Sequence, residues 1–193
     1  MVQKEHLTLE GLAKIVALKA SMNMGLSEEL KAAFSQGDLV PISRPSVVDP
    51  EIKDPNWLVG FVDGEGCFFI NIINSPRHRL GIQVQLVFQL TQHSRDVALM
   101  ESLINYLDCG NISKKRETFV FIVTKFSDIE NKIIPFFQKY PLLGVKRSDY
   151  LDFCRVAELM QNKAHLTKEG LDQIRQIKTG MNKGRLDENS VEG

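Results

Sequence analysis

The sequence predicts an α+β domain built around an antiparallel sheet, and three observations support this. Segments rich in β-branched and aromatic residues form two hairpin pairs, and helical segments stand before, between and after them. A 20-residue stretch near the amino end recurs near the carboxyl end. A short apolar run at residues 58–70 contains two acids and three glycines. This last feature does not fit an ordinary core segment.

Composition is that of a folded protein. The chain has 193 residues, 43% of them hydrophobic, which is enough for one sizeable core. No export signal or run of about 18 apolar residues occurs, so we expect a soluble protein with no membrane partner. The cysteines Cys67, Cys109 and Cys154 are too scattered for a disulfide framework or a zinc site. Net charge is zero, but residues 1–66 carry −4 and residues 67–193 carry +4.

The internal repeat predicts the domain organisation. Residues 6–25 and 165–184 share 11 of 20 identities at a constant offset of 159, including glycine and asparagine positions. We therefore expect a duplicated unit of which this chain carries the tail of one copy and the whole of the next. The expected segments are a helical tail (1–34), a linker (35–54), a complete domain (55–184) and a flexible tail (185–193).

Local signals place the elements. Thr8 is expected to cap a helix that reaches about Asn23, and Ser27 a short helix through Phe34. In the domain, Asp54-Pro55 predicts a helix start, and the helix should run to about Glu65. Gly66 is then expected to end it as a C-terminal glycine.

The remaining elements follow in order. Strand pairs are expected at 67–73 with 81–91, joined by the loop SPRHRLG, and at 109–114 with 118–124. A helix at 94–106 separates the pairs. After them, Ser127–Glu130 reads as a capping box, whose helix Pro135 and Pro141 interrupt. A helix at 148–161 and the repeated helix complete the domain.

The helix at 55–65 has a notched face. Gly60 and Gly64 lie four residues apart, so a second helix, such as its equivalent in another copy, can approach closely. Glu65 falls in the last turn, where unpaired carbonyls already make the helix end negative. A divalent cation shared by two such ends would relieve the repulsion. The alternative is that Asp63 and Glu65 simply decorate a surface helix.

These residues carry a family resemblance. The segment LVGFVDGEG, residues 58–66, resembles the signature of the LAGLIDADG homing endonucleases, and the element order resembles their αββαββα domain with its saddle-like sheet. Leu58, Gly60, Gly64 and Gly66 match the pattern, as does Asp63. Glu65 replaces the second aspartate but keeps the carboxylate. The repeat and linker resemble the two-repeat fungal organellar branch.

The resemblance implies a chemistry. Glu65 is expected to bind a divalent metal, magnesium in most relatives, with the Gly64 carbonyl as a second ligand. Phosphodiester hydrolysis follows, because a bound metal lowers the pKa of an attacking water. Lys146 and Gln92 match the family's supporting catalytic residues, although Asp96 follows Arg95 where relatives often have a basic group. The interface with the second unit is expected to include Leu58, Gly60, Phe61 and Gly64.

The resemblance also implies double-stranded DNA as the partner, read by the sheet. Alternation puts Phe68, Ile70 and Ile72 on one face of the first strand, away from the expected DNA. The expected readers are Cys67, Phe69, Asn71, Ile73, Gln83, Gln85 and Gln89, with Arg77, Arg79, Lys114, Lys115 and Arg116 at the hairpin tips. Amide side chains suit base edges and cations suit phosphates. Glutamines that merely face water are the alternative.

Three readings of the whole chain stay open. It is a DNA endonuclease that acts as a homodimer or as half of a fused enzyme, an RNA-binding maturase that helps an intron to splice, or a non-catalytic DNA-binding fragment. Only one signature helix is present in the sequence. A mitochondrial location is implied by the resemblance alone.

Overall fold

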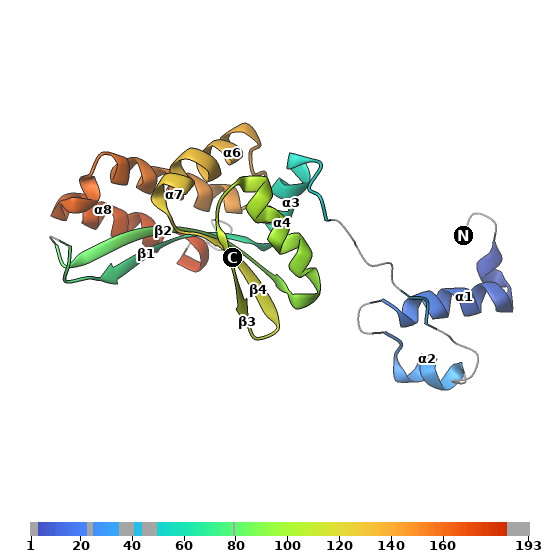
Figure 1. The fold of residues 1–193 in the computed structure, drawn as a ribbon. Coiled ribbons are helices and arrows are strands. Elements are labelled where there is room, and N and C mark those ends of the chain that lie inside the picture. Colours follow the sequence, from blue (N-terminus) through green and yellow to red (C-terminus); the bar gives the residue numbers. More distant parts are fainter. Residues whose placement is uncertain (1–3, 23–24, 35–40, 44–49, 79, 185–193) are drawn as a thin grey trace, which may run out of the picture. The chain divides into compact units, whose positions relative to one another are not determined.

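The computed structural model describes residues 4–22, 25–34, 41–43, 50–78 and 80–184. The chain forms two compact units, Met1–Val48 and Asp49–Gly193 (Figure 1). Within the described residues, no helix is both long enough and apolar enough to cross a lipid bilayer.

The first unit contains a 3-10 turn, η1 (Glu5–Leu7), and the helices α1 (Leu9–Ala20) and α2 (Glu28–Ala33). Both expected caps are confirmed: Thr8 accepts a hydrogen bond from the Gly11 amide, and Ser27 accepts one from the Leu30 amide. Each cap satisfies an amide that the first helical turn leaves unpaired.

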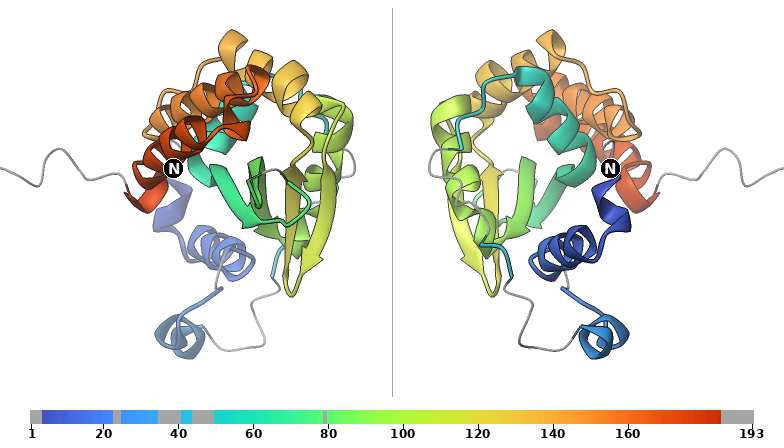
Figure 2. Two further views of the ribbon diagram at one scale, coloured as in Figure 1. Left: turned by 90° about the vertical axis from the view of Figure 1, so that its left-hand side faces the viewer. Right: turned by 90° about the vertical axis from the view of Figure 1, so that its right-hand side faces the viewer.

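The second unit has the α+β architecture that the sequence predicts. Its elements are α3 (Pro55–Glu65), β1 (Gly66–Asn74), β2 (Ile82–His93), η2 (Ser94–Asp96), α4 (Val97–Leu107), β3 (Asn111–Lys115), β4 (Thr118–Val123), α5 (Phe126–Asp128), η3 (Ile129–Ile133), α6 (Ile134–Lys139), α7 (Lys146–Gln161), η4 (Ala164–Leu166), α8 (Lys168–Thr179) and η5 (Asn182–Gly184). The strands form one antiparallel sheet in the order β1-β2-β4-β3. Figure 2 shows α6 and α7 over one face of this twisted sheet.

The core lies between the sheet and these helices. The Phe68 ring, which is 1% exposed, stacks on Phe88 with centroids 4.9 Å apart. It also meets Phe137, Tyr150 and Phe153 edge to face at 5.4–5.5 Å. Such pairs add to the free energy gained by burying the rings. Phe68 is therefore the centre of the packing between sheet and helices, and the predicted alternation of β1 is confirmed.

Replacing Phe68 with alanine is expected to lower the free energy of unfolding of the second unit by about 3–5 kcal/mol, through lost burial and the cavity left behind. Guanidinium unfolding followed by circular dichroism measures this loss. The adjacent Phe69, half-buried on the opposite sheet face, is the matched control. Equal losses from Phe68→Ala and Phe69→Ala would contradict the assignment of the core face.

Gly66 ends α3 as expected: it is the residue after the last helical one, and with a φ of −74° it begins β1 directly. Glycine is needed there for close packing, because a Cβ would lie 2.6 Å from the Val62 side chain.

Two expectations for the segment after β4 are wrong. Ser127–Glu130 is not a capping box, because the helix begins after an extended Lys125 with no side-chain cap. Pro135 does not break the segment, since a preceding π-helical stretch, Ile129–Ile133, accommodates the residue without a backbone donor.

The repeated segments have the same local structure. Thr167 caps α8 by accepting from the Gly170 amide, as Thr8 caps α1 by accepting from Gly11. A Cβ at Gly170 would lie 2.1 Å from a backbone oxygen of the preceding turn, and one at Gly11 would lie 1.9 Å from the equivalent oxygen. Each helix has 12 residues. The identities at offset 159 therefore preserve a specific turn-and-cap geometry.

Candidate functional site

The notched helix α3 starts as predicted. The Asp54 carboxylate accepts a hydrogen bond from the Asn56 amide, and Pro55 occupies the first turn. Leu58 and Val62 are 0% exposed and fix the inner side of α3 in the core. Leu58 was expected at the interface with a second unit, and this expectation is wrong because its side chain is fully used in the packing of its own unit.

The outer side of α3 is open. Gly60 and Gly64 are exposed, and a Cβ added to either would meet nothing within 4 Å. Beside them, Trp57 is 48% exposed and stacks on Phe61 with centroids 5.2 Å apart. In the right-hand view of Figure 2, α3 (teal) lies in front of the orange and red helices α7 and α8. The predicted face for a second helix is thus exposed and partly apolar.

Asp63 ties the end of α3 to the loop before α7. One oxygen of its carboxylate accepts hydrogen bonds from the amides of Leu143 (3.1 Å) and Gly144 (3.0 Å). The other oxygen is buried and has no hydrogen-bond partner. The loop also carries Leu143 and Val145 at 87% and 85% exposure, which extends the apolar surface beside α3. Asp63 is therefore engaged in ordering the helix end.

Lys146 meets the same helix end. It is the first residue of α7, and its ammonium donates a 2.6 Å hydrogen bond to the carbonyl oxygen of Gly64. A cation there is favourable, because the last carbonyls of a helix carry partial negative charge. Glu65 is exposed next to it, and its carboxylate has no hydrogen bond or ion pair with any described residue. The tertiary fold thus brings Gly64, Glu65 and Lys146 together.

Gln92 lies at the far end of β2. Leu90 pairs with Gly66, so Gln92 extends two residues past the junction of α3 and β1. It pairs with Phe119 and is half-buried, on the sheet face that carries the core. The basic group expected nearby is neutralised, because the Arg95 guanidinium pairs with Asp96 at 3.4 Å.

The opposite face of the sheet, here called the outer sheet face, collects the predicted readers. Strand register places Cys67 opposite Gln89, Asn71 opposite Gln85 and Ile73 opposite Gln83. The Asn71 amide donates to the Gln85 amide oxygen at 3.5 Å, so part of this surface is pre-ordered. The same register places four further polar residues on the outer sheet face, which the sequence analysis did not predict: Thr91, Asn111, Ser113 and Thr118. Extending the alternation through the second hairpin would have identified them.

The hairpin-tip cations divide between the two faces. Lys115 pairs with Thr118 on the outer sheet face, whereas Lys114 pairs with Phe119 on the other face and lies 6.0 Å from that ring's centroid. Lys114 therefore lies on the face opposite the outer sheet face, because adjacent strand residues point in opposite directions, and its expected contact with DNA stays a prediction. Arg116 is exposed in the turn, with a φ of 53°. Arg77 is exposed in the first hairpin loop, and Arg79 lies outside the described residues.

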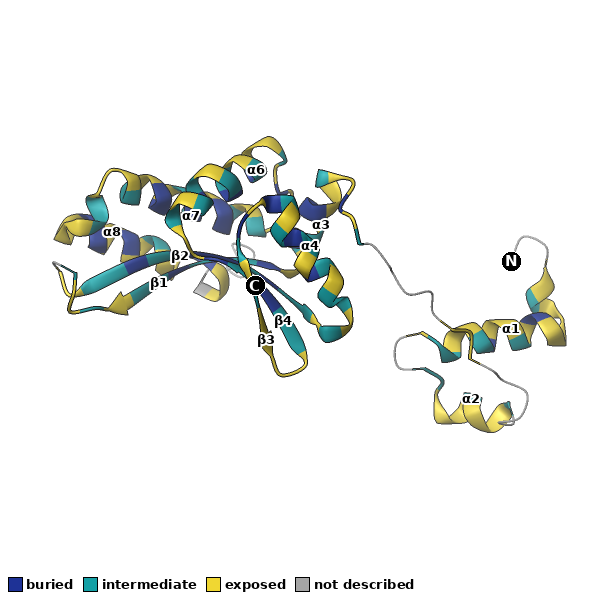
Figure 3. Ribbon diagram, viewed as in Figure 1, coloured by how far each residue is buried: buried dark blue, intermediate teal, exposed yellow. Residues whose placement is uncertain are grey.

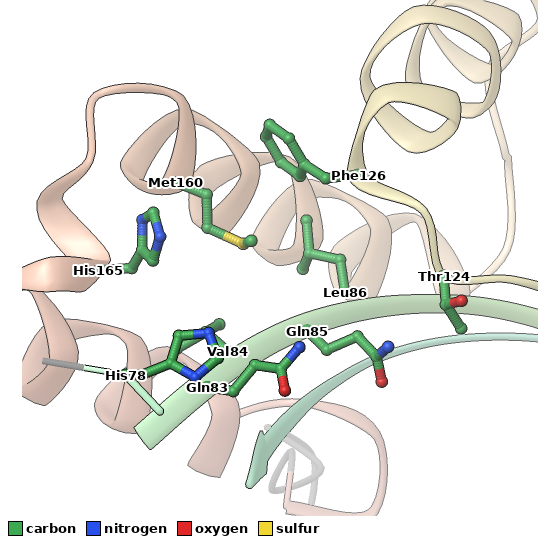
Figure 4. Close-up of a pocket in the computed structure, with 9 residues that line it drawn as sticks. All are labelled: His78, Gln83, Val84, Gln85, Leu86, Thr124, Phe126, Met160 and His165. Atoms are coloured by element: carbon green, nitrogen blue, oxygen red, sulfur yellow. The ribbon is translucent and has the colours of Figure 1, made fainter. Parts of the chain in front are cut away.

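A separate cavity of about 260 Å³ lies at the other end of β2 (Figure 4). Its lining contains two imidazoles and no carboxylate, and it includes none of the α3 residues. The lining residues are His78, Gln83, Val84, Gln85, Leu86, Thr124, Phe126, Met160 and His165. We therefore do not assign the cavity a part in the α3 site.

The stability of the second unit is expected to depend on pH through His165, which lines this cavity. Burial lowers the pKa of His165 from 6.5, and the nearby His78 lowers it further. The folded state therefore takes up the proton less readily than the unfolded state. The free energy of unfolding should fall as pH decreases below about 6.5. Guanidinium unfolding near neutral pH and at mildly acidic pH measures the loss, which should shrink in His165→Gln; an unchanged loss would contradict this cause.

The metal-binding capacity of one unit is small. Among the described residues, no group of three or more histidine, cysteine, aspartate or glutamate side chains is arranged to hold an ion. The end of α3 offers one free carboxylate, of Glu65, and the Gly64 carbonyl, whose second lone pair is not used by Lys146. These are the hard oxygen donors that magnesium and calcium prefer, but such ions take about six ligands. The remaining ligands must come from outside this unit.

Comparison with known proteins gives consistent matches. Residues 58–157 match the family described as LAGLIDADG endonuclease. The sequence is 42% identical to "Probable intron-encoded endonuclease 3" of Neurospora crassa over 174 residues, which cover 89% of this chain and 32% of that protein. A "Probable intron-encoded endonuclease 2" of the same organism is 38% identical over 94% of this chain and 41% of its own length. The chain thus spans well under half of these curated relatives.

Solved structures agree with the fold. The I-SmaMI LAGLIDADG homing endonuclease bound to cleaved DNA superposes with a TM-score of 0.91 at 56% identity, covering 96% of this chain and 62% of that one. The I-LtrWI LAGLIDADG homing endonuclease bound to target DNA gives a TM-score of 0.89 at 48% identity, with the same coverage. I-SmaMI has also been solved on uncleaved DNA in the presence of calcium ions.

Proposed function

Because this chain belongs to the LAGLIDADG endonuclease family, we propose that it forms one half of a site-specific endonuclease that hydrolyses double-stranded DNA with a divalent metal. The observation that carries the proposal is the meeting of Gly64, Glu65 and Lys146 at the end of a helix whose outer side is open. The relatives solved on cleaved and target DNA support the same substrate class.

Each group has a distinct role in this proposal. Glu65 holds the metal, magnesium under physiological conditions, with the Gly64 carbonyl as a second ligand. A divalent cation bound there supplies a water of lowered pKa and stabilises charge on the scissile phosphate. Lys146 presents its ammonium to a phosphate oxygen or the attacking water, and Gln92 orders solvent beside them. Asp63 keeps the helix end and the 143–145 loop in place.

The second half of the site comes from another helix of the same kind. The open face around Gly60 and Gly64 permits close approach, and Trp57, Phe61, Leu143 and Val145 offer apolar surface beside it. A partner helix arriving by two-fold or pseudo-two-fold symmetry would bring a second carboxylate to the metal. The partner is either a second copy of this chain or another repeat.

Recognition of DNA is proposed for the outer sheet face. Its amide side chains alternate along paired strands, which suits bidentate contacts with adenine in the major groove. Lys115, Arg116 and Arg77 at the hairpin ends would neutralise phosphates and fix the register. Since one unit covers half of a site, the full target is long and each half is read by one sheet.

A mitochondrial setting is also proposed. A relative in Podospora anserina, 39% identical over 60% of this chain, is described as a protein in an ND4 intron, and one in Schizosaccharomyces pombe as a cox1 intron protein. An intron-encoded role in an organelle genome fits these relatives.

Selection from a randomised duplex pool tests the function. The chain is incubated with the pool and magnesium, and cut molecules are captured through their new ends and sequenced. A single long consensus with cleavage at its centre is the expected result. Binding to a consensus with no strand breaks at any divalent metal concentration would overturn cleavage by a pair of these chains, and selective binding of RNA over duplex DNA would favour a splicing role.

Replacing Lys146 with methionine is expected to lower the cleavage rate by about 10²–10³-fold, the usual loss when one preorganised charge-stabilising donor is removed. Affinity for the selected duplex should change little, because phosphate contacts elsewhere persist. Single-turnover cleavage and gel-shift binding measure the two quantities. Lys168→Met, at the exposed start of α8, is the control, and equal cleavage by both variants would exclude Lys146 from the reaction.

A further inference from the structure

Asn182 lies shortly after the end of α8 and bonds to two elements that form the candidate site. Its side-chain amide donates a 3.0 Å hydrogen bond to the carbonyl oxygen of Phe68 in β1, and its side-chain oxygen accepts one from the Cys67 thiol at 3.6 Å. Its backbone amide donates to a carboxylate oxygen of Asp149, in the first turn of α7, at 2.9 Å. One residue therefore bridges the start of β1 and the start of α7.

This bridge lies beside the contact between α3 and α7. Phe68 follows four residues after Gly64, whose carbonyl oxygen accepts the hydrogen bond from the Lys146 ammonium. Asp149 follows three residues, about one helical turn, after Lys146. The bridge and the bond from Lys146 thus close a ring of contacts around the end of α3, where Glu65 is exposed.

The position of Asn182 is fixed by the core and by its backbone. Met181, the preceding residue, is 5% exposed and belongs to the same buried cluster as Phe68. β1 lies at one edge of the sheet, so its outward carbonyls need partners other than a strand. The φ of Asn182 is 52°, a left-handed conformation that asparagine tolerates better than most residues. Figure 3 shows buried residues (dark blue) on both α7 and α8, so both sides of the bridge are anchored.

We propose that Asn182 is a positioning residue for cleavage: by holding α7 to β1, it sets where the Lys146 ammonium lies relative to Glu65. The inference rests on the proposed function, in which these two groups act on the phosphate and the metal. Loss of the bonds to β1 lets the first turn of α7 shift, and a displacement of about 1 Å in a reacting group can cost about 10²-fold in rate. Asn182 acts through Lys146 and not on the substrate.

Asn182→Gly tests the bridge, because glycine keeps the left-handed backbone and the amide that donates to Asp149 and removes only the bonds to β1. Single-turnover cleavage of the selected duplex should be slower by about 10-fold or more, with affinity for the duplex nearly unchanged. Lys163→Gly is the matched control, since Lys163 is also left-handed, with a φ of 58°, and its side chain makes no capping hydrogen bond. Equal cleavage by the two variants would overturn the proposal.

A double variant separates positioning from a loss of general stability. If Asn182 acts through Lys146, Asn182→Gly should change the cleavage rate of a Lys146→Met chain by less than about 2-fold, because the group that it positions is already absent. Full additivity of the two losses in rate would contradict the proposal, since an effect on general stability does not depend on Lys146.

The Lys146 ammonium gives a readout that needs no cleavage. In the chain without DNA, its bond to Gly64 should slow the exchange of the ammonium protons with water, measured by nitrogen-15 NMR and assigned with Lys146→Met. Asn182→Gly should speed this exchange several-fold, and Lys163→Gly should not. An ammonium that responds in a chain that cuts no DNA would uphold the positioning of Lys146 and refute cleavage by a pair of these chains. An unresponsive ammonium in a chain that cuts DNA would refute the positioning and uphold cleavage.

Discussion

Replacing Glu65 with glutamine is expected to lower the rate of DNA cleavage by at least about 10³-fold, because a neutral amide of the same size no longer supplies the negative charge that holds the metal. Glu65 is the one carboxylate at the end of α3 that is not engaged: Asp63 already accepts two backbone hydrogen bonds. Removing its charge should leave the fold intact, since the side chain is exposed and has no partner among the described residues.

The measurement is single-turnover cleavage of the selected duplex in magnesium, with binding measured in calcium. Binding should persist within a few-fold while cleavage is lost, which distinguishes a catalytic role from a role in docking. Glu101→Gln, at an exposed position of α4, is the control for loss of one negative charge. Cleavage by the Glu65 variant at the rate of the Glu101 variant would refute the metal assignment.

Replacing Gly60 with leucine is expected to reduce the rate of cleavage by at least about 100-fold without unfolding the second unit. No atom lies within 4 Å of a Cβ at this position, so the new side chain enters open space in the isolated unit. Leucine is also a better helix former than glycine, and the unit should gain roughly 0.5–1 kcal/mol in free energy of unfolding. A second helix, however, could no longer reach the notch, and displacement of reacting groups by about 1 Å can cost 10²-fold in rate.

Three measurements test this effect: thermal unfolding, the molar mass in solution by light scattering, and the rate of cleavage. The expected pattern is equal or higher stability, loss of the assembled form, and cleavage reduced by at least about 100-fold. Gln173→Leu, on the exposed side of α8, controls for an added apolar side chain. Full cleavage activity in Gly60→Leu would show that the outer side of α3 is not where the second half of the site arrives.

Features that depend on residues close together in the sequence were predicted correctly. The caps at Thr8, Ser27 and Asp54 depend on residues two or three positions away, and they are confirmed. The alternation of β1 also follows from neighbouring residues. The capping box predicted at 127–130 is wrong, because the helical segment begins earlier, at Phe126. Ile129 and Ile133, both 0% exposed, anchor this segment in the core, and it is π-helical between them, before Pro135.

Assignment of faces needed more than the pattern in one strand. Lys114 and Lys115 are equivalent as a charged pair in the sequence, but strand register points them to opposite sides of the sheet. Leu58 matches the signature as well as Gly60 does, and only the position of α3 against the sheet shows that Leu58 is core and Gly60 is surface. A signature pattern records which residues are required and does not record which neighbour requires them.

By itself, the sequence determined the α+β order, the notched helix ending in a free acid, and the repeat that relates α1 to α8, because each is set by spacing within a turn, a strand or a duplicated segment. Only the tertiary structure decided that Lys146 meets the Gly64 carbonyl across a separation of 82 residues, and that Asp63 is bound by the loop before α7. Those contacts form when the core around Phe68 brings α7 against the sheet, and packing over such a distance has no local signal.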